Sequence, residues 1–307
     1  MKRFTLDLPA DYRLHDILAF HSRDTESVAE EVGDTHLRKG VMLDGVPVVL
    51  AVVFDNALAP TSASCTVHAD GKLAKAAQQR VREAALSILG LRIDPEAFCA
   101  FAAKDAMFGP LTLAQPGLRI VQSATVFEAL TWAIIGQQIN LSFAISLRRT
   151  FILQAGRQHS SGLWCYPEAA DAVKLGIDDL TSRKFSRAKA ETLLRLANLV
   201  ASGELQLDVT PANSIEQISA ALLAVKGIGP WTVNYGLLRG YGYADCSLHG
   251  DVAIRAALQQ LLGEDTKPDM PRTEQILARY APHRTMAAAH LWASLHPRGD
   301  SDDKDSA

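Results

Sequence analysis

The sequence is poor in cysteine, and its four cysteines lie far apart. Cys65, Cys99, Cys165 and Cys246 form no pair with the spacing of metal ligands. The same spread excludes a cysteine-ligated iron–sulfur cluster, which needs clustered cysteines. Disulfides are not expected in a cytosolic chain. We therefore expect all four thiols to be small, buried, apolar side chains.

Long apolar runs and an apolar leader are also lacking. No run approaches the roughly 18–20 apolar residues that span a bilayer. The first residues, MKRFTLDLPADYRLHD, carry charges where a signal peptide has an apolar stretch. We therefore expect a cytoplasmic protein that makes no contact with a membrane.

An excess of positive charge is missing as well. The chain has 31 Lys and Arg against 34 Asp and Glu, a net charge of −3, and composition alone does not indicate a nucleic-acid binder. Part of the negative charge lies in residues 299–307, which we expect to form a disordered acidic tail. The 307 residues, 48% of them hydrophobic and 21% charged, predict about two soluble globular domains.

Residues 1–92 predict a small α+β domain. Gly40–Phe54 has the pattern of two strands joined at Asp44–Gly45, a strong hairpin signal. Pro47 indicates that the second strand begins at an edge. A third strand and an amphipathic helix that stops at Gly90 are expected over Ser64–Asp70 and Lys72–Leu89.

Residues 93–298 predict an all-α domain, so the fold class is mainly α with a small antiparallel sheet domain in front. Thr125 with Glu128, and Ser214 with Gln217, have the spacing of capping boxes that open helices. The other expected helices cover Arg187–Ala201, Val252–Leu262, Thr273–Tyr280 and Thr285–Leu295.

A glycine hairpin lies between two of the expected helices. Lys226-Gly227-Ile228-Gly229 is followed by Pro230, which is preferred in a first helical turn. Such a turn exposes backbone amides at a helix N-terminus, where they can hold a phosphate without side-chain charge. On these residues alone, a plain helix–helix turn with a capping glycine is the favoured interpretation.

Asp251 stands just before the helix expected at Val252–Leu262. An aspartate at this position is most often an N-cap. The helix N-terminus also favours an ionised carboxylate, so capping and a catalytic role are compatible.

The wider string V-K-G-I-G-P-W-T-V-N-Y resembles the helix-hairpin-helix motif of the DNA glycosylase superfamily. That superfamily has an aspartate some 20 residues beyond the hairpin, and Asp251 lies 20 residues after Trp231. The resemblance implies that Asp251 is the catalytic carboxylate, which stabilises the oxocarbenium-like sugar of a flipped nucleotide. Bifunctional members carry a Schiff-base lysine at the slot that Trp231 occupies here, so no lyase activity is expected.

The 3-methyladenine glycosylase II (AlkA type) branch is the most similar one. Its G-Q-Q block is matched by Ala133–Ala144, and its C-terminal helix with a second tryptophan by Ala289–Leu295. It also places a sheet domain before the helices. The resemblance implies base excision repair of alkylated bases such as 3-methyladenine and 7-methylguanine. Trp231 and Trp292 would line a pocket that attracts a cationic base through π faces.

The same resemblance implies the contacts with double-stranded DNA. Gln138 would be the wedge that fills the gap left by the flipped nucleotide, and the expected hairpin contacts are Lys226, Gly227, Gly229 and Thr232. The carbonyls of Leu223, Val225 and Ile228 would hold a Na⁺ or K⁺ ion. No other cofactor is expected. The enzyme is expected to be a monomer that associates with the nucleoid through DNA.

Two departures leave the preferred base open: His249 replaces a proline of many relatives, and Val252 replaces an aromatic residue of the best-known members. The basic run Arg183–Lys189 could reach phosphates or form a solvated helix entrance. Three alternatives remain: a non-catalytic helix-hairpin-helix binding module, a glycosylase for oxidised, deaminated or mismatched bases, and an unrelated all-α protein.

Overall fold

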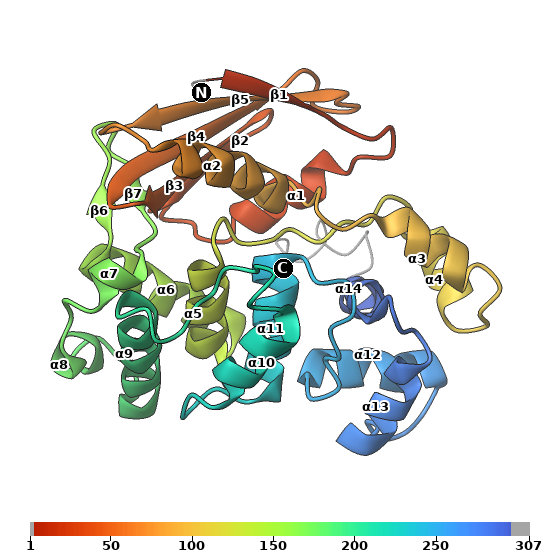
Figure 1. The fold of residues 1–307 in the computed structure, drawn as a ribbon. Helices are drawn as coiled ribbons and strands as arrows, with labels where there is room; N and C mark the ends of the chain where they lie inside the picture. Colours follow the sequence, from red (N-terminus) through yellow and green to blue (C-terminus); the bar gives the residue numbers. More distant parts are fainter. Residues whose placement is uncertain (1–2, 296–307) are drawn as a thin grey trace, which may run out of the picture. The chain divides into compact units, whose positions relative to one another are not determined.

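The computed structural model describes residues 3–295, which form two compact units (Figure 1). The first unit joins the residues up to Gly90 with Val121–Tyr241, and the second joins Leu91–Ile120 with the residues from Gly242 onward. The expected domain boundary at residue 92 stays a prediction, and the expected tail at 299–307 lies outside the described residues.

A five-stranded antiparallel sheet opens the first unit, in the order β1-β5-β4-β3-β2. The strands are β1 (Arg3–Asp7), β2 (Glu30–Gly33), β3 (His36–Leu43), β4 (Val46–Phe54) and β5 (Ser62–Ala69). The hairpin predicted at Asp44–Gly45 is confirmed. Both residues have positive φ, 51° and 73°, as the tight two-residue turn requires.

The expectation that Pro47 marks an edge is wrong, because β4 is the central strand of the sheet. Pro47 lies near the start of β4, where the partner strand β5 has already ended at Ala69. Its carbonyl accepts a hydrogen bond from the Asp70 amide at 3.0 Å. The missing proline N–H therefore falls at the end of the ladder, where it interrupts few strand hydrogen bonds.

Two helices accompany the sheet (Figure 1), α1 (Leu14–His21) and α2 (Lys75–Ile88). The sequence predicted α2 and its end at Gly90, which has φ +67°, but not α1, β1 or β2. Val81 and Ala84 of α2 face Val41 and Leu50 of the sheet around a small apolar space. This face is one apolar core of the unit.

The rest of the first unit is almost entirely helical, as predicted, apart from a two-stranded ribbon of β6 (Arg157–Gln158) and β7 (Trp164–Cys165). Eight of the eleven residues of α5 are buried, so most of this helix lies in the interior of the unit. The helices are α5 (Val126–Gly136), α6 (Leu141–Ala155), α7 (Ala169–Ala172), α8 (Ile177–Thr181), α9 (Arg187–Ala201), α10 (Ile215–Leu223), α11 (Pro230–Gly236) and the π-helical turn η1 (Leu237–Tyr241).

The two predicted capping boxes differ in outcome. Ser214 and Gln217 form a complete box at the start of α10. At α5 only half of the box forms: the Thr125 hydroxyl accepts from the Glu128 amide at 3.1 Å, but the Glu128 carboxylate accepts from Ala124 at 3.0 Å instead of reaching back to Thr125. The other carboxylate oxygen of Glu128 contacts the buried cations Lys39 and Arg148, and these ion pairs explain why the box is incomplete.

The second unit contains α3 (Pro95–Ala102), α4 (Phe108–Ala114), α12 (Val252–Leu262), α13 (Met270–Ala278) and α14 (Arg284–Ser294). An aromatic cluster forms its core, in which Phe98 packs edge-on against Phe108 with ring centroids 5.6 Å apart, and Tyr280 lies 4.3 Å from Phe108. The three helices predicted in this region are confirmed to within a few residues.

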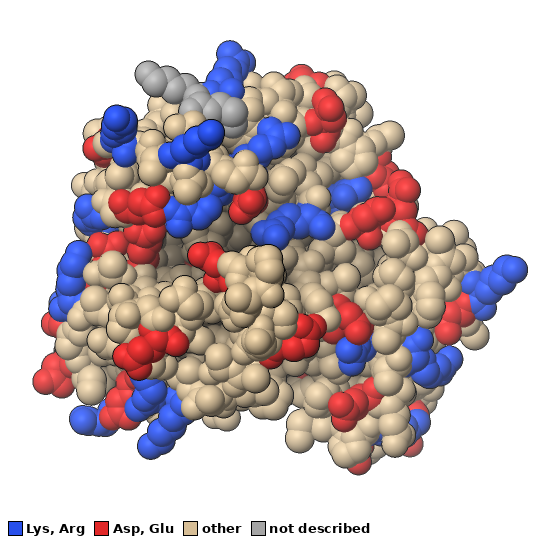
Figure 2. All heavy atoms as spheres, in the orientation of Figure 1, with Lys and Arg blue, Asp and Glu red and all other residues tan. Residues whose placement is uncertain are grey.

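Three of the four cysteines are buried and Cys99 is half-buried, close to the expectation for small apolar side chains. No helix within residues 3–295 is long and apolar enough to cross a membrane. On the face shown in Figure 2, basic and acidic side chains are interspersed. Any contact with a polyanion on this face would therefore rest on a few local groups.

Candidate active site

The predicted hairpin lies between α10 and α11 in the first unit. The Ile228 amide donates to the Val225 carbonyl at 3.0 Å and closes the turn. Gly229 is the N-cap of α11, and Pro230 is its first residue. The following amides of the first helical turn lack intrahelical acceptors, so the turn can present N–H groups to an anion.

The two glycines of the hairpin are needed for different reasons. Gly227 has φ +97°, and a Cβ at this position would lie 2.0 Å from the Thr192 hydroxyl oxygen. Gly229 has an ordinary φ of −106°, and a Cβ there would meet nothing within 4 Å. Gly227 is therefore required by the fold, whereas Gly229 leaves open space beside the hairpin.

The carbonyls of Leu223, Val225 and Ile228 are oxygen ligands of the type that binds a monovalent cation. The last carbonyls of a helix have no intrahelical donors, and the Val225 carbonyl keeps a second lone pair after accepting from Ile228. Within residues 3–295, no group of three or more His, Cys, Asp or Glu side chains could hold a metal ion.

The predicted wedge, Gln138, is exposed in the turn between α5 and α6 and has a left-handed backbone, with φ +55°. Its neighbour Gln137 donates to the Gly227 carbonyl at 3.1 Å and to the Thr232 hydroxyl at 2.9 Å. The structure thus brings the wedge turn and the hairpin together. The sequence did not predict this role of Gln137, because the partners lie 90 and 95 residues away.

Trp231 is half-buried on α11 and stacks on Tyr235, with ring centroids 5.1 Å apart and planes inclined by 29°. The indole of Trp132 donates to the Tyr235 hydroxyl at 3.1 Å. The Arg239 guanidinium lies 5.6 Å from the Tyr235 ring centroid. Tyr235 was not predicted as a site residue, although its spacing of four residues from Trp231 places both on one helix face.

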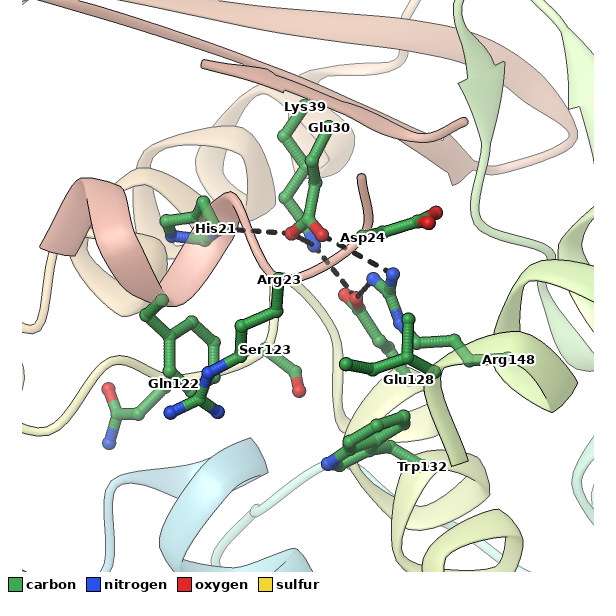
Figure 3. A pocket seen from close by; sticks show the side chains of 12 residues that line it. His21, Arg23, Asp24, Glu30, Lys39, Gln122, Ser123, Glu128, Trp132 and Arg148 are labelled. Atoms are coloured by element: carbon green, nitrogen blue, oxygen red, sulfur yellow. Dashed lines mark hydrogen bonds and ion pairs between the residues drawn. The ribbon is translucent and has the colours of Figure 1, made fainter. Parts of the chain in front are cut away.

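A pocket of the first unit lies beside these aromatic residues and is lined from α1, β2, β3, α5 and α6 (Figure 3). Phe20 contributes a ring that carries Arg23 at 4.2 Å and Arg239 at 5.0 Å from its centroid. Trp132 lines the same pocket. Aromatic faces and guanidinium groups therefore meet at one place.

One wall of the pocket is a cluster of buried charges (Figure 3). Lys39 contacts Glu30 at 2.6 Å and Glu128 at 2.8 Å. Arg148 contacts the same carboxylates at 3.3 and 2.8 Å, and His21 lies 2.9 Å from Glu30. The cluster ties two strands of the sheet to α5 and α6, and each charge has a partner of opposite sign.

The carboxylates of the cluster are held in their ionised form. Burial alone would raise the pKa of Glu30, but the charges of Lys39 and Arg148 and the hydrogen bond from His21 outweigh burial and hold this pKa well below its ordinary value. The pKa of Glu128 is lowered for the same reason, chiefly by Lys39 and Arg148. The cluster is a structural ion network, because its members satisfy one another.

Asp251 is the N-cap of α12 in the second unit, as predicted. Its Oδ1 accepts from the amides of Ala253 and Ile254 at 2.9 and 3.0 Å. The same oxygen accepts from the Trp292 indole at 3.3 Å. Three donors on one oxygen fix the orientation of the carboxylate at the positive end of a helix dipole.

The structure thus joins Asp251 with Trp292 inside the second unit, whereas Trp231 and the hairpin belong to the first unit. His249, one of the departures, lies 3.0 Å from the Ser247 hydroxyl. Val252, the other departure, is 64% exposed. The indole contact of Asp251 could not be read from the sequence, since the two residues are 41 positions apart.

The residues of the basic run Arg183–Lys189 have different roles. Lys189 donates to the carbonyls of Ile134 and Ile135 at 3.4 and 3.0 Å and to that of Gln137, so it caps the end of α5. Arg187 pairs with Glu191 at 2.9 Å on the surface of α9. Lys184 is exposed and has φ +70°. The run is therefore mainly a helix entrance, and Lys189 is a structural cation.

Comparison with known proteins finds similar sequences among proteins named DNA-3-methyladenine glycosylases. No family model matches the chain. A putative DNA-3-methyladenine glycosylase of Bacillus subtilis is 32% identical over 179 residues, which are 58% of this chain and 62% of that protein. The chain thus spans about six tenths of the length of that relative. DNA-3-methyladenine glycosylase 2 of Escherichia coli is 24% identical over 94% of this chain and 96% of its own length.

The fold agrees with these sequence matches. A 3-methyladenine DNA glycosylase from Archaeoglobus fulgidus superposes with a TM-score of 0.78 over 94% of this chain and 97% of its own, at 21% identity. The similarity covers both the sheet and the helices around the hairpin. By sequence the chain is similar to proteins named DNA-3-methyladenine glycosylases, and by fold it is similar to the solved structure of one of them.

Proposed function

We propose that this protein is a monofunctional DNA glycosylase of base excision repair, which releases alkylated bases such as 3-methyladenine and 7-methylguanine from double-stranded DNA. The observation that carries the proposal is the Asp251 carboxylate. Two backbone amides and the Trp292 indole hold it at a helix N-terminus, in a chain whose relatives are named DNA-3-methyladenine glycosylases.

The carboxylate supplies the negative charge that the reaction needs. As the bond between C1′ and the base nitrogen breaks, the base leaves with the electron pair and the sugar gains oxocarbenium character. Asp251 stabilises this positive charge and orients the water whose oxygen then bonds to C1′. α12 begins beside the carboxylate, so the positive end of the helix dipole lies next to this group.

Trp231 and Trp292 are the proposed walls of the base pocket. Alkylation of a ring nitrogen makes the base cationic, and a π face attracts such a base by about 0.5–2 kcal/mol. The stack of Trp231 on Tyr235 orients one of these faces. Gln138 would occupy the gap that the flipped nucleotide leaves in the duplex.

The hairpin is the proposed anchor for the DNA backbone. The amides at Gly227 and Gly229 and the exposed Lys226 would face a phosphate. The predicted contact Thr232 is buried, and its hydroxyl accepts from Gln137 instead. A Na⁺ or K⁺ ion held by the carbonyls of Leu223, Val225 and Ile228 would add positive charge there. Trp231 occupies the slot of the Schiff-base lysine, so the product would be an abasic site in an intact strand.

The test is base release from methylated duplex DNA, with the released bases identified by mass and unmethylated DNA as the control. We expect 3-methyladenine and 7-methylguanine in solution and an uncut strand until heat or alkali is applied. Binding of the duplex without any base release would identify a binding module instead. Release only from DNA with oxidised, deaminated or mismatched bases would overturn the proposed substrate class.

A further inference from the structure

The turn between α5 and α6 is held rigidly from several sides. Gln137 is the C-cap residue of α5, and Asn140 is the N-cap of α6, where its side chain accepts from the Phe143 amide at 2.8 Å. Gln138 lies between the two caps with φ +55°. The exposed Gln138 side chain therefore projects from a turn whose backbone has little freedom.

Gln137 connects this turn to the hairpin through its amide nitrogen. That nitrogen donates to the Gly227 carbonyl at 3.1 Å and to the Thr232 hydroxyl at 2.9 Å. A glutamine amide has two N–H donors, and both are used. The two acceptors lie on either side of the hairpin, one in the turn and one in the first turn of α11, where Thr232 is 2% exposed.

Helix α9 braces both segments from one face. Lys189 donates to the Ile135 carbonyl at 3.0 Å and to the Gln137 carbonyl. Thr192 lies against the site where Gly227 would carry a Cβ, and Arg195 donates to the Lys226 carbonyl at 2.9 Å. Residues three apart lie on the same side of a helix, so these three side chains form one stripe from the wedge turn to the hairpin.

We propose that Gln137 is a positioning residue, which fixes the wedge Gln138 at a set distance from the phosphate-binding hairpin. The inference rests on the proposed function and adds a mechanical link to it. DNA anchored at the hairpin then meets Gln138 in one place along the duplex. Without the two hydrogen bonds of Gln137, anchor and wedge move independently, and base flipping suffers while phosphate binding persists.

Three variants test this link. Gln137→Ala removes the amide, and Gln137→Glu keeps the size of the side chain but places an acceptor against the Gly227 carbonyl. Gln138→Ala removes the wedge. Gln79→Ala is the matched control, because Gln79 is exposed on α2 and contacts Glu83 of the same helix. Each full-length variant is compared in thermal unfolding, affinity for undamaged duplex at fixed salt, the fluorescence rise of 2-aminopurine beside the target base, and single-turnover release of 7-methylguanine.

Both Gln137 variants should bind undamaged duplex within about twofold of the parent, because the hairpin amides and Lys226 remain. Their 2-aminopurine signal should fall, and base release should slow by about 10- to 100-fold, the range expected when a reacting group is misplaced by about an ångström. Gln137→Ala combined with Gln138→Ala should be no slower than Gln138→Ala alone, since both act in one step.

Two results would overturn the proposal: Gln137 variants that behave like Gln79→Ala, or a loss of duplex affinity that matches the loss of base release. The second result would mean that Gln137 only supports the hairpin. The proposed function fails separately. If the parent protein releases no methylated base while the 2-aminopurine signal still depends on Gln137, the positioning role stands and the substrate class is wrong.

Discussion

Replacing Asp251 with asparagine would separate capping from catalysis. Oδ1 of the aspartate accepts all three hydrogen bonds, from Ala253, Ile254 and Trp292. An asparagine carbonyl oxygen can occupy the same place and accept from the same donors. The substitution therefore removes a negative charge and leaves the local geometry in place.

The expected cost to stability is small. Asparagine and aspartate cap helices about equally well, and the lost interaction with the helix dipole amounts to about 0.3–1 kcal/mol. For a protein of this size that change lowers the melting temperature by at most about 4 °C. The expected cost to catalysis is much larger, about 10²–10⁴-fold in base release, because charge stabilisation and water orientation are both lost.

The assay is single-turnover release of 7-methylguanine, measured with saturating enzyme so that binding does not limit the rate. Asp269→Asn is the matched control. Asp269 caps α13 in the same unit, and its side chain accepts from the Arg272 amide at 2.9 Å. The control should keep full activity with a similarly small change in melting temperature. Affinity for undamaged duplex should stay the same or rise in Asp251→Asn, since a negative charge is lost.

Base release near the parent rate by a folded, DNA-binding Asp251→Asn protein would refute the reasoning. Asp251 would then be only a helix cap. Equal losses in Asp251→Asn and Asp269→Asn would point to stability and would likewise remove the case for a catalytic carboxylate.

Three other perturbations have clear expected outcomes. The Gly229→Val protein should fold normally, because the added Cβ meets open space, and should bind DNA more weakly in a titration at fixed salt. Gly227→Val should weaken binding and also lower the melting temperature, because it combines a strained φ with a clash. Borohydride should trap no covalent adduct with DNA in high yield, because Trp231 fills the lysine slot; efficient trapping would contradict the hydrolytic mechanism. The pKa values of Glu30 and Glu128 are lowered in the folded protein. The stability that this gives is present above their unfolded pKa of about 4.3 and is lost as the pH falls through the folded values. Glu128→Gln should therefore lower the free energy of unfolding by about 3–5 kcal/mol at neutral pH and make that free energy, measured by denaturant titration, depend less on pH in the acid range.

Local chemistry allowed most of the elements to be predicted. The turn at Asp44–Gly45, the box at Ser214 and the helix end at Gly263, which has φ +65°, each depend on residues within a few positions. The strand β1 was missed because its pairing partner β5 lies about 60 residues away. Pro47 misled for the same reason: where β5 ends decides whether a proline is tolerated, and the sequence around Pro47 does not contain that information.

The site shows the same division. Asp251 and the hairpin could be predicted because a cap, a glycine turn and a fixed interval are linear patterns. Gln137 and Tyr235 acquire their roles from partners on other helices or through ring stacking. Glu128 looked like a capping residue, yet Lys39 and Arg148 draw its carboxylate into the buried cluster. Such competition between partners is decided only by tertiary packing.

The buried charge cluster also limits how the chain can be divided. A fragment starting at residue 93 would keep Glu128 and Arg148 but lose Glu30 and Lys39, the partners supplied by the sheet. In the full chain Glu128 also pairs with Lys39, and Arg148 also pairs with Glu30. In the fragment, Glu128 and Arg148 could pair only with each other or with water. We therefore expect such a fragment to be less stable than the full chain, because its own sequence cannot replace the partners that the sheet supplies.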